Sequence, residues 1–169
     1  MKKRWLIGGV VILALAMLGT VLIMVLCDDA VEKSGVVEKP VEKFSLSAEM
    51  YGRSEVIEIT AGEFDQLVAE KKSFVVVLHM VVCPAEFPVT NSAKELAHVE
   101  GMVIYSLVED EFKQTMLAKT IKYLPSVAII HEGELAGYLD AEADEDVKYY
   151  KTAAGLKEWV EQYVDNLNL

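Results

Sequence analysis

The sequence predicts one α/β domain that follows an N-terminal membrane helix, and three observations lead to this prediction. A valine-rich apolar run, residues 74–82, is too short to cross a bilayer and is typical of a β-strand buried on both faces. Strand-like and helix-like stretches alternate before and after this run, as they do in parallel sheets with helical crossovers. An uncharged stretch lies ahead of all of them, between Trp5 and Leu26.

The uncharged stretch is long enough to span a membrane. Its 22 residues would form a helix of about 33 Å at ~1.5 Å per residue. Basic residues precede it and Asp28 follows it, which predicts a single-pass protein of the cell membrane with a cytoplasmic N-terminus and an extracytoplasmic C-terminal domain. A cleaved signal peptide would have a shorter apolar core that ends in small residues, and lipidation of Cys27 would need a small residue where Leu26 stands.

Composition divides the chain into three predicted parts: an anchor at residues 1–27, a flexible stalk at 28–54 and a folded domain at 55–169. The stalk mixes Glu, Lys and Val without a sustained period. The net charge is −11, and all 27 acidic residues follow the apolar stretch. A surface this acidic argues against a nucleic-acid partner and against adsorption to anionic lipid.

Hydrophobic periodicity predicts the elements of the domain. A short alternating strand at residues 56–60 leads into a helix, because Thr60 and Glu63 have the spacing of a capping box. The buried strand at 73–82 comes next. The later elements are a helix at 92–99, a strand at 102–107, a helix within 109–123, a hairpin of strands at 127–131 and 135–139, and a C-terminal helix at 156–167. The acidic residues 140–146 are predicted to form a solvated loop.

This order of elements resembles the thioredoxin family over residues 56–167. Two stretches carry the resemblance: residues 75–87 (VVVLHMVVCPAEF) match the family's central strand and redox loop, and residues 120–137 (TIKYLPSVAIIHEGELAG) match its cis-proline loop and hairpin. The resemblance implies a β-α-β-α-β-α-β-β-α fold, with a mixed central sheet flanked by helices. The surroundings of Cys83 and the anchor also resemble the thioredoxin-like accessory proteins found beside bacteriocin exporters.

The redox loop departs from the family pattern. The family's Cys-x-x-Cys motif reads Cys83, Pro84, Ala85 and Glu86 here, so the nucleophilic cysteine is retained and Glu86 occupies the position of the resolving cysteine. The family's buried acid should fall near Val77, which cannot transfer a proton. Apolar neighbours and Glu86 should also keep the Cys83 thiol protonated at neutral pH. Dithiol turnover is therefore not expected.

A proline adds to this departure. Pro88 would disturb a helix that began at Cys83, which suggests that the helix begins near residue 87 or 88. Cys83 would then lie about a turn away from the helix dipole that normally activates the family's cysteine.

Two functions remain open on the sequence. In the first, Cys83 exchanges a single thiol with a protein client, while Pro84, Leu124 and a cis Pro125 position the client, as the resemblance implies. In the second, the domain is a redox-inactive scaffold for a membrane-associated partner or export system. Pairing of Cys27 and Cys83 between two chains is a third possibility. No cofactor or metal is expected, because the three histidines fall on different elements without ligand spacing.

Overall fold

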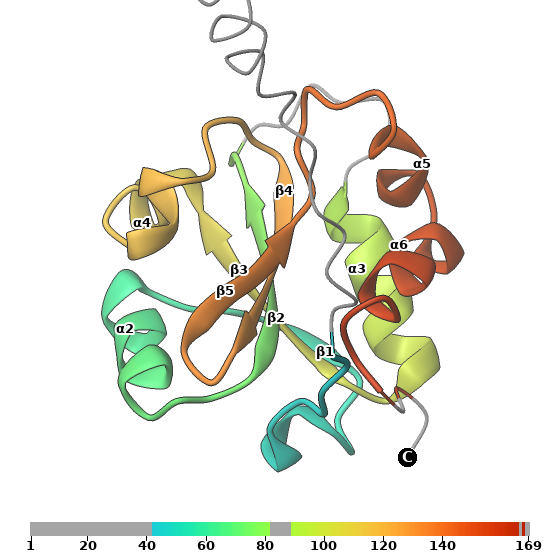
Figure 1. The fold of residues 1–169 in the computed structure, drawn as a ribbon, viewed down its shortest axis with the longest axis horizontal. Helices are drawn as coiled ribbons and strands as arrows, with labels where there is room; N and C mark the ends of the chain where they lie inside the picture. The colour runs from blue at the N-terminus through green and yellow to red at the C-terminus, as the bar shows by residue number, and fades with distance from the viewer. Residues whose placement is uncertain (1–41, 82–88, 166, 168–169) are drawn as a thin grey trace, which may run out of the picture. The chain divides into compact units, whose positions relative to one another are not determined.

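A five-stranded mixed sheet forms the centre of the domain, with strand order β1-β3-β2-β4-β5 (Figure 1). The structure is a computed structural model, which describes residues 42–81, 89–165 and 167. The strands are β1 (Glu55–Glu58), β2 (Phe74–His79), β3 (Val103–Val108), β4 (Ser126–His131) and β5 (Glu134–Tyr138). β1 and β2 pair with β3 in parallel, whereas β4 is antiparallel to both β2 and β5. The predicted thioredoxin-like fold is confirmed by this order and pairing.

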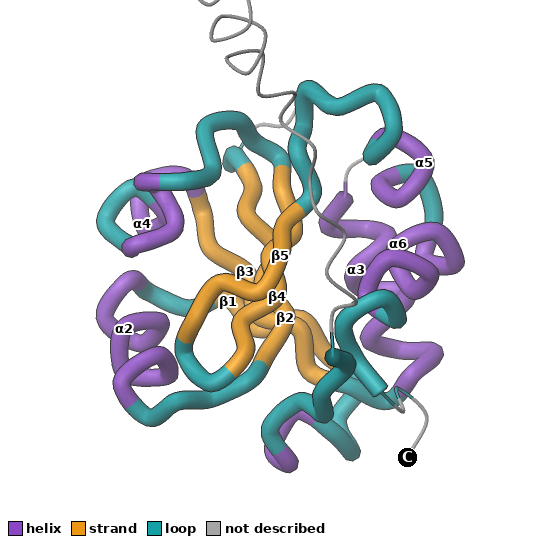
Figure 2. The backbone as a smooth tube through the Cα atoms, viewed as in Figure 1, coloured by secondary structure: helices purple, strands orange, loops and turns teal. Residues whose placement is uncertain are grey.

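Helices cover both faces of the sheet, with α2 and α4 on one side and α3 and α6 on the other (Figures 1 and 2). The helices are α2 (Ala61–Ala69), α3 (Val89–Glu100), α4 (Glu109–Phe112), α5 (Val147–Tyr150) and α6 (Ala153–Val160), with 3-10 turns η2 (Ala48–Met50) and η3 (Met116–Lys119). α2 begins with the predicted capping box, in which the Thr60 hydroxyl accepts from the Glu63 amide and the Thr60 amide donates to the Glu63 carboxylate.

β2 is the buried centre of the sheet. Its first five residues expose none of their surface: Phe74, Val75, Val76, Val77 and Leu78. The strand ends at His79, because neither neighbouring strand extends further beside it. On one side β3 passes into α4. On the other side β4 begins only at Ser126, after a proline that has no amide hydrogen to donate. The prediction of a strand to residue 82 is therefore wrong, and Val81 is 83% exposed.

The single helix predicted within residues 109–123 is also wrong, because the chain forms two short elements there, α4 and η3. α4 ends at Phe112, and the buried Thr115 hydroxyl donates to the Phe112 carbonyl at 2.8 Å. The same oxygen of Thr115 accepts from the Leu117 amide at 3.3 Å, so it begins η3. A threonine side chain that satisfies the backbone in this way competes with a continuous helix. The apolar positions that suggested one helix, Phe112, Leu117 and Ile121, remain buried.

Residues 42–54 belong to the folded domain, so the domain begins before residue 55, where the sequence analysis placed its boundary. The Phe44 amide donates to the Tyr163 carbonyl, and the Asp165 amide donates to the Phe44 carbonyl, both at 2.9 Å. Leu46 is 4% exposed and Met50 is fully buried. α6 likewise stops at Val160, earlier than predicted, because the following residues bend to pair with this segment.

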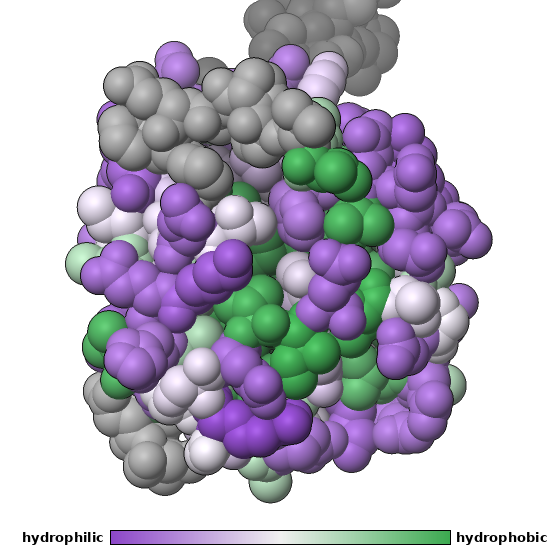
Figure 3. Space-filling view, turned by 180° about the vertical axis from the view of Figure 1, so that it is seen from behind, coloured by the Kyte–Doolittle hydropathy of each residue, from purple (hydrophilic) through white to green (hydrophobic). Residues whose placement is uncertain are grey.

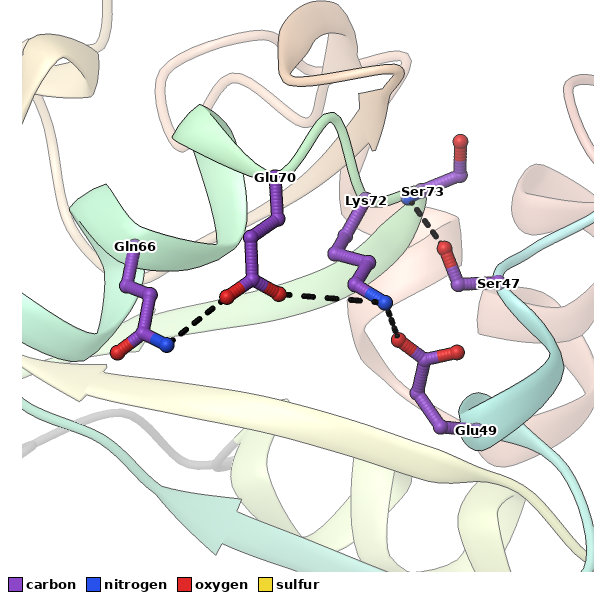
Figure 4. A network of polar contacts seen from close by, with 6 residues as sticks. All are labelled: Ser47, Glu49, Gln66, Glu70, Lys72 and Ser73. Carbon is purple, nitrogen blue, oxygen red and sulfur yellow. Dashed lines mark hydrogen bonds and ion pairs between the residues drawn. The ribbon is translucent and has the colours of Figure 1, made fainter.

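Polar contacts fix the same segment to the start of β2 (Figure 4). Ser47 and Ser73 are joined twice, since the Ser47 amide donates to the Ser73 carbonyl and the Ser73 amide donates to the Ser47 hydroxyl, both at 2.8 Å. The Lys72 ammonium lies 2.5 Å from a Glu49 oxygen. This contact between Lys72 and Glu49 is the main reason that the pKa of Glu49 lies below its usual range.

The predicted membrane span lies outside the described residues. Within the part of the chain that the structure describes, no helix is both long and apolar enough to cross a membrane. Seen from behind, the surface of the molecule is largely hydrophilic, with an apolar area near the middle of the face (Figure 3).

Met50→Ala tests whether residues 42–54 are part of the fold. We expect the substitution to lower the free energy of unfolding by about 2–5 kcal/mol, because it leaves a cavity in the core. Glu42→Ala, at an exposed position of the same segment, should change it by less than about 0.5 kcal/mol. Denaturant unfolding of the full chain in detergent micelles measures both values. Equal, near-zero effects would mean that the segment is a solvated stalk.

Candidate functional site

A cleft of about 500 Å³ opens where β2 ends, between the sheet and the start of α3. Five parts of the chain contribute to it: β1, the end of β2, α3, β3 and the proline loop. Its lining residues are Val56, Glu58, His79, Met80, Val81, Val89, Thr90, Asn91, Lys94, Ser106 and Pro125. A cleft at the carboxyl end of the parallel strands is the usual place for a binding site in an open α/β sheet.

The proline loop is one wall of this cleft. The peptide bond between Leu124 and Pro125 is cis, and both residues are half-buried. The next residue, Ser126, is fully buried, and its hydroxyl donates to the Leu139 carbonyl at 2.7 Å. Because this bond ties the start of β4 to the segment after β5, Pro125 is held in place beside the cleft.

The predicted redox loop lies outside the described residues. Cys83, Pro84 and Glu86 all fall in the segment 82–88, and so does Pro88. The described residues on either side of this segment, Val81 and Val89, both line the cleft. The described residues that flank the cysteine-containing segment therefore line the same cleft as Pro125.

One exposed apolar side chain lines the cleft, and a second lies just before the proline of its proline-loop wall in the sequence. In the described part of the chain, the large apolar residues with the most exposed surface are Val81 at 83%, Val99 at 66%, Tyr123 at 50% and Val147 at 36%. Val81 lines the cleft, and Tyr123 lies two positions before Pro125. Exposed apolar side chains that gather at a cleft are typical of a binding surface.

Charged and titratable side chains of both signs line the cleft. Glu58 is exposed at the end of β1, and Lys94 is exposed on α3. Neither forms an ion pair with another described residue. His79 is half-buried, with its Nδ1 3.2 Å from the Met80 carbonyl, so this nitrogen carries the proton when the contact is a hydrogen bond.

Val77 occupies the position at which the family resemblance placed a buried acid. It is fully buried, opposite Ser106 of β3 and Val127 of β4. Ser106 lines the cleft and is 5% exposed. The central strands therefore place a hydroxyl, and no carboxylate, at this end of the cleft.

Sequence reasoning missed most residues of the cleft, among them the polar residues Glu58, Lys94 and Ser106. A signal for Lys94 was present, because it follows Thr90 by four positions and so shares a face of α3 with it. No such signal exists for the other two. Glu58 and Ser106 are 48 positions apart and meet only through the parallel register of β1 and β3.

The other candidates from the sequence have structural roles. In the acidic loop, the Asp140 amide donates to the Asp146 carboxylate at 2.8 Å, and the Glu142 amide donates to the Asp140 carboxylate at 3.0 Å. Burial raises the pKa of Tyr150, and the two aspartates raise it further. The described residues contain no group of three or more His, Cys, Asp or Glu that could hold a metal ion.

Comparisons with known proteins find similarity to solved structures alone. No protein-family model matches the sequence, and no curated protein matches it. Among solved structures, the oxidised thioredoxin of Plasmodium falciparum is similar at 16% identity over 66% of this chain and 100% of that one, with a TM-score of 0.49. A mutant thioredoxin from Halobacterium salinarum is similar at 16% identity over 68% and 95% of the two chains, with a TM-score of 0.48.

A third similar structure is oxidised thioredoxin O2 from Arabidopsis thaliana, at 16% identity over 68% of this chain and 99% of that one, with a TM-score of 0.48. Likeness at this level says nothing of activity, substrate or partner. The thioredoxin-like fold of this chain follows from its own strand order, its strand pairing and the placement of its helices.

Proposed function

We propose that this protein is a membrane-anchored, extracytoplasmic thioredoxin-like protein that uses Cys83 for single-thiol exchange with a protein client. One observation carries the proposal: the two described residues that flank the cysteine segment, Val81 and Val89, line the same cleft as the cis proline Pro125. The uncharged stretch at residues 5–26 and the basic residues before it support the anchor and its orientation.

The client binds as an extended segment with apolar side chains. Val81 offers exposed apolar surface in the cleft, and Tyr123 offers more in the chain that leads into Pro125. The backbone of Leu124 is the candidate partner for the client's main chain, because it directly precedes Pro125 outside the paired part of β4. Pro84 stands next to Cys83 in the sequence and completes the candidate binding residues.

The exchange needs no outside oxidant. The Cys83 thiolate attacks one sulfur of a client disulfide, a Cys83–client disulfide forms, and the other client sulfur leaves as a thiolate. One disulfide replaces another, so electrons balance. Since Glu86 stands where a resolving cysteine would, this chain cannot release the client itself. The client stays attached until a thiolate of its own or of another molecule attacks the mixed disulfide and displaces the Cys83 thiolate.

The charged side chains of the cleft act on the thiol in opposite directions. In this proposal Cys83 faces the cleft, where Lys94 favours the thiolate and Glu58 disfavours it. The proton that Cys83 loses passes to water or to the client, because Val77 cannot accept it. The thiol is therefore a slow nucleophile whose reactivity depends on the balance of the two charges.

A redox-inactive scaffold is the second candidate function. The fully buried Val77 favours it, because the hydrocarbon side chain leaves the central strand without a proton-transfer group at the cleft. In that case the same apolar cleft binds its partner without any covalent step.

Trapping of clients separates the two functions. We expect disulfide-linked adducts of the full-length protein to accumulate on non-reducing gels and to vanish in Cys83→Ala, because no resolving cysteine releases them. Cys27→Ala serves as the matched control and should keep the adducts. Identical gels for wild type and Cys83→Ala, with partner capture unchanged, would leave the scaffold as the function.

The pH dependence of Cys83 alkylation tests the charges in the cleft. We expect Lys94→Met to raise the pH midpoint by up to about one unit, because it removes a cation that favours the thiolate, and Glu58→Gln to lower it by a similar amount. Alkylation by a small reagent in a Cys27→Ala background measures the midpoint. If neither substitution moves it, Cys83 does not face this cleft.

A further inference from the structure

A second cleft, of about 290 Å³, lies between α3 and α6, with none of its lining residues in the first cleft. The last two turns of α3 form one wall and the first turns of α6 form the other. Its lining residues are Glu95, Leu96, Val99, Glu100, Ala153, Ala154 and Lys157. The volume of this cleft is at the low end of the range for ligand sites. The cleft therefore suits a single side chain better than a drug-sized molecule.

Glu100 is the unusual residue of this cleft. It is 7% exposed, and one of its carboxylate oxygens, Oε1, lies 2.8 Å from the Lys157 ammonium. The other oxygen, Oε2, is buried and accepts no hydrogen bond from any residue that the structure describes. A buried acceptor without a donor costs free energy, and the cost is greater for a charged group.

The position of Glu100 in its helix adds to this cost. It is the final residue of α3, where the negative end of the helix dipole disfavours a carboxylate. Lys157 offsets part of the charge, and its hydrogen bond with Glu100 is the main reason that the pKa of Lys157 lies above its usual value. Lys157 also lies 3.7 Å from Glu161, so one ammonium serves two carboxylates.

The surroundings favour a cation over other ligands. Around the cleft, the carboxylates of Glu95, Glu100 and Glu161 outnumber the single ammonium of Lys157. The start of α6 is the positive end of that helix dipole, which would favour an anion. The Thr152 hydroxyl already serves as an acceptor there, because the Gly155 amide donates to it at 3.0 Å. A metal ion would need several oxygen ligands, and among the described residues that line the cleft only one side-chain oxygen is buried without a partner.

The apolar part of the cleft suits an aliphatic chain. Leu96 is buried in its wall, the small side chains of Ala153 and Ala154 leave room, and Val99 is 66% exposed at the rim. Lysine and arginine combine an apolar stem with a cationic end that donates hydrogen bonds. Because Oε2 is buried, a side chain that lines the cleft must shift for a cation to reach it.

We propose that the cleft between α3 and α6 binds a lysine or arginine side chain of a partner protein. The stem of that side chain packs on Leu96 and Val99, and its cation donates to Oε2 of Glu100. The site is independent of Cys83, so it remains whether or not the proposed thiol exchange is correct.

Two pentapeptides test the proposal on the full chain in detergent micelles. One has the sequence Ala-Val-Lys-Val-Ala with blocked ends, and the other has norleucine in place of lysine, which keeps the stem and removes the ammonium. We expect the lysine peptide to shift the backbone amide signals of Val99, Ala153 and Lys157 saturably in ¹⁵N spectra. The norleucine peptide should bind at least about tenfold more weakly, the loss expected for a charge-assisted hydrogen bond.

Two matched variants locate the cation. Glu100→Gln should weaken binding of the lysine peptide by at least about tenfold. Glu95→Gln, which removes an exposed carboxylate from the same cleft, should weaken it by no more than about twofold. Cys83→Ala should bind the peptide as the wild type does.

Three results would overturn the proposal. Equal binding of the two peptides would mean that the cleft recognises only apolar surface, and equal losses in the two glutamate variants would mean diffuse attraction to acidic residues. The absence of saturable shifts at these residues would make Glu100 and Lys157 a structural ion pair only. The comparison of the two peptides uses the wild-type chain, so it does not depend on whether a variant folds.

Discussion

The structure depends on the burial of β2 between β3 and β4. Five consecutive apolar side chains of this strand are fully buried, and each neighbour pairs with it in a fixed register. Because parallel pairing on one side and antiparallel pairing on the other stop at nearly the same place, the end of β2 is a defined edge. The first cleft, the proline loop and the start of α3 all meet at that edge.

This edge combines a cis proline with the residues that flank the cysteine segment. Pro125 lines one wall of the cleft, and Val81 and Val89 line it as well. Valine replaces the expected acid in the central strand, and the charges that line the cleft, Glu58 and Lys94, come from β1 and α3. The proposed binding of a client therefore needs little beyond the cleft that the fold supplies. Fast thiol exchange would need a proton-transfer group, which the central strand does not carry because Val77 stands there.

The α3–α6 cleft shows a different use of the same scaffold. Its ion pair joins two helices on one face of the sheet, away from the edge where β2 ends. The Glu100 carboxylate is buried at the negative end of the α3 dipole, and only one of its two oxygens bonds to Lys157. As a purely structural feature, this arrangement costs free energy of folding. A partner's cation would remove that cost, which gives the domain a recognition surface separate from its thiol.

The sequence by itself determined the buried strand, the capping box of α2, the hairpin and the order of elements, because each is a local pattern of burial or hydrogen bonding. It also determined that one cysteine is left in the domain. Only the tertiary structure decided where β2 ends, that Thr115 divides one predicted helix into two turns, and that Met50 belongs to the core. It also brought Glu58, Ser106 and Lys94 to one cleft, and Glu100 to Lys157. The bonds of Thr115 are local, but they oppose the helical period of the apolar residues around it. The other contacts join distant parts of the chain, and strand register and helix packing fix them without leaving a periodic trace in the sequence.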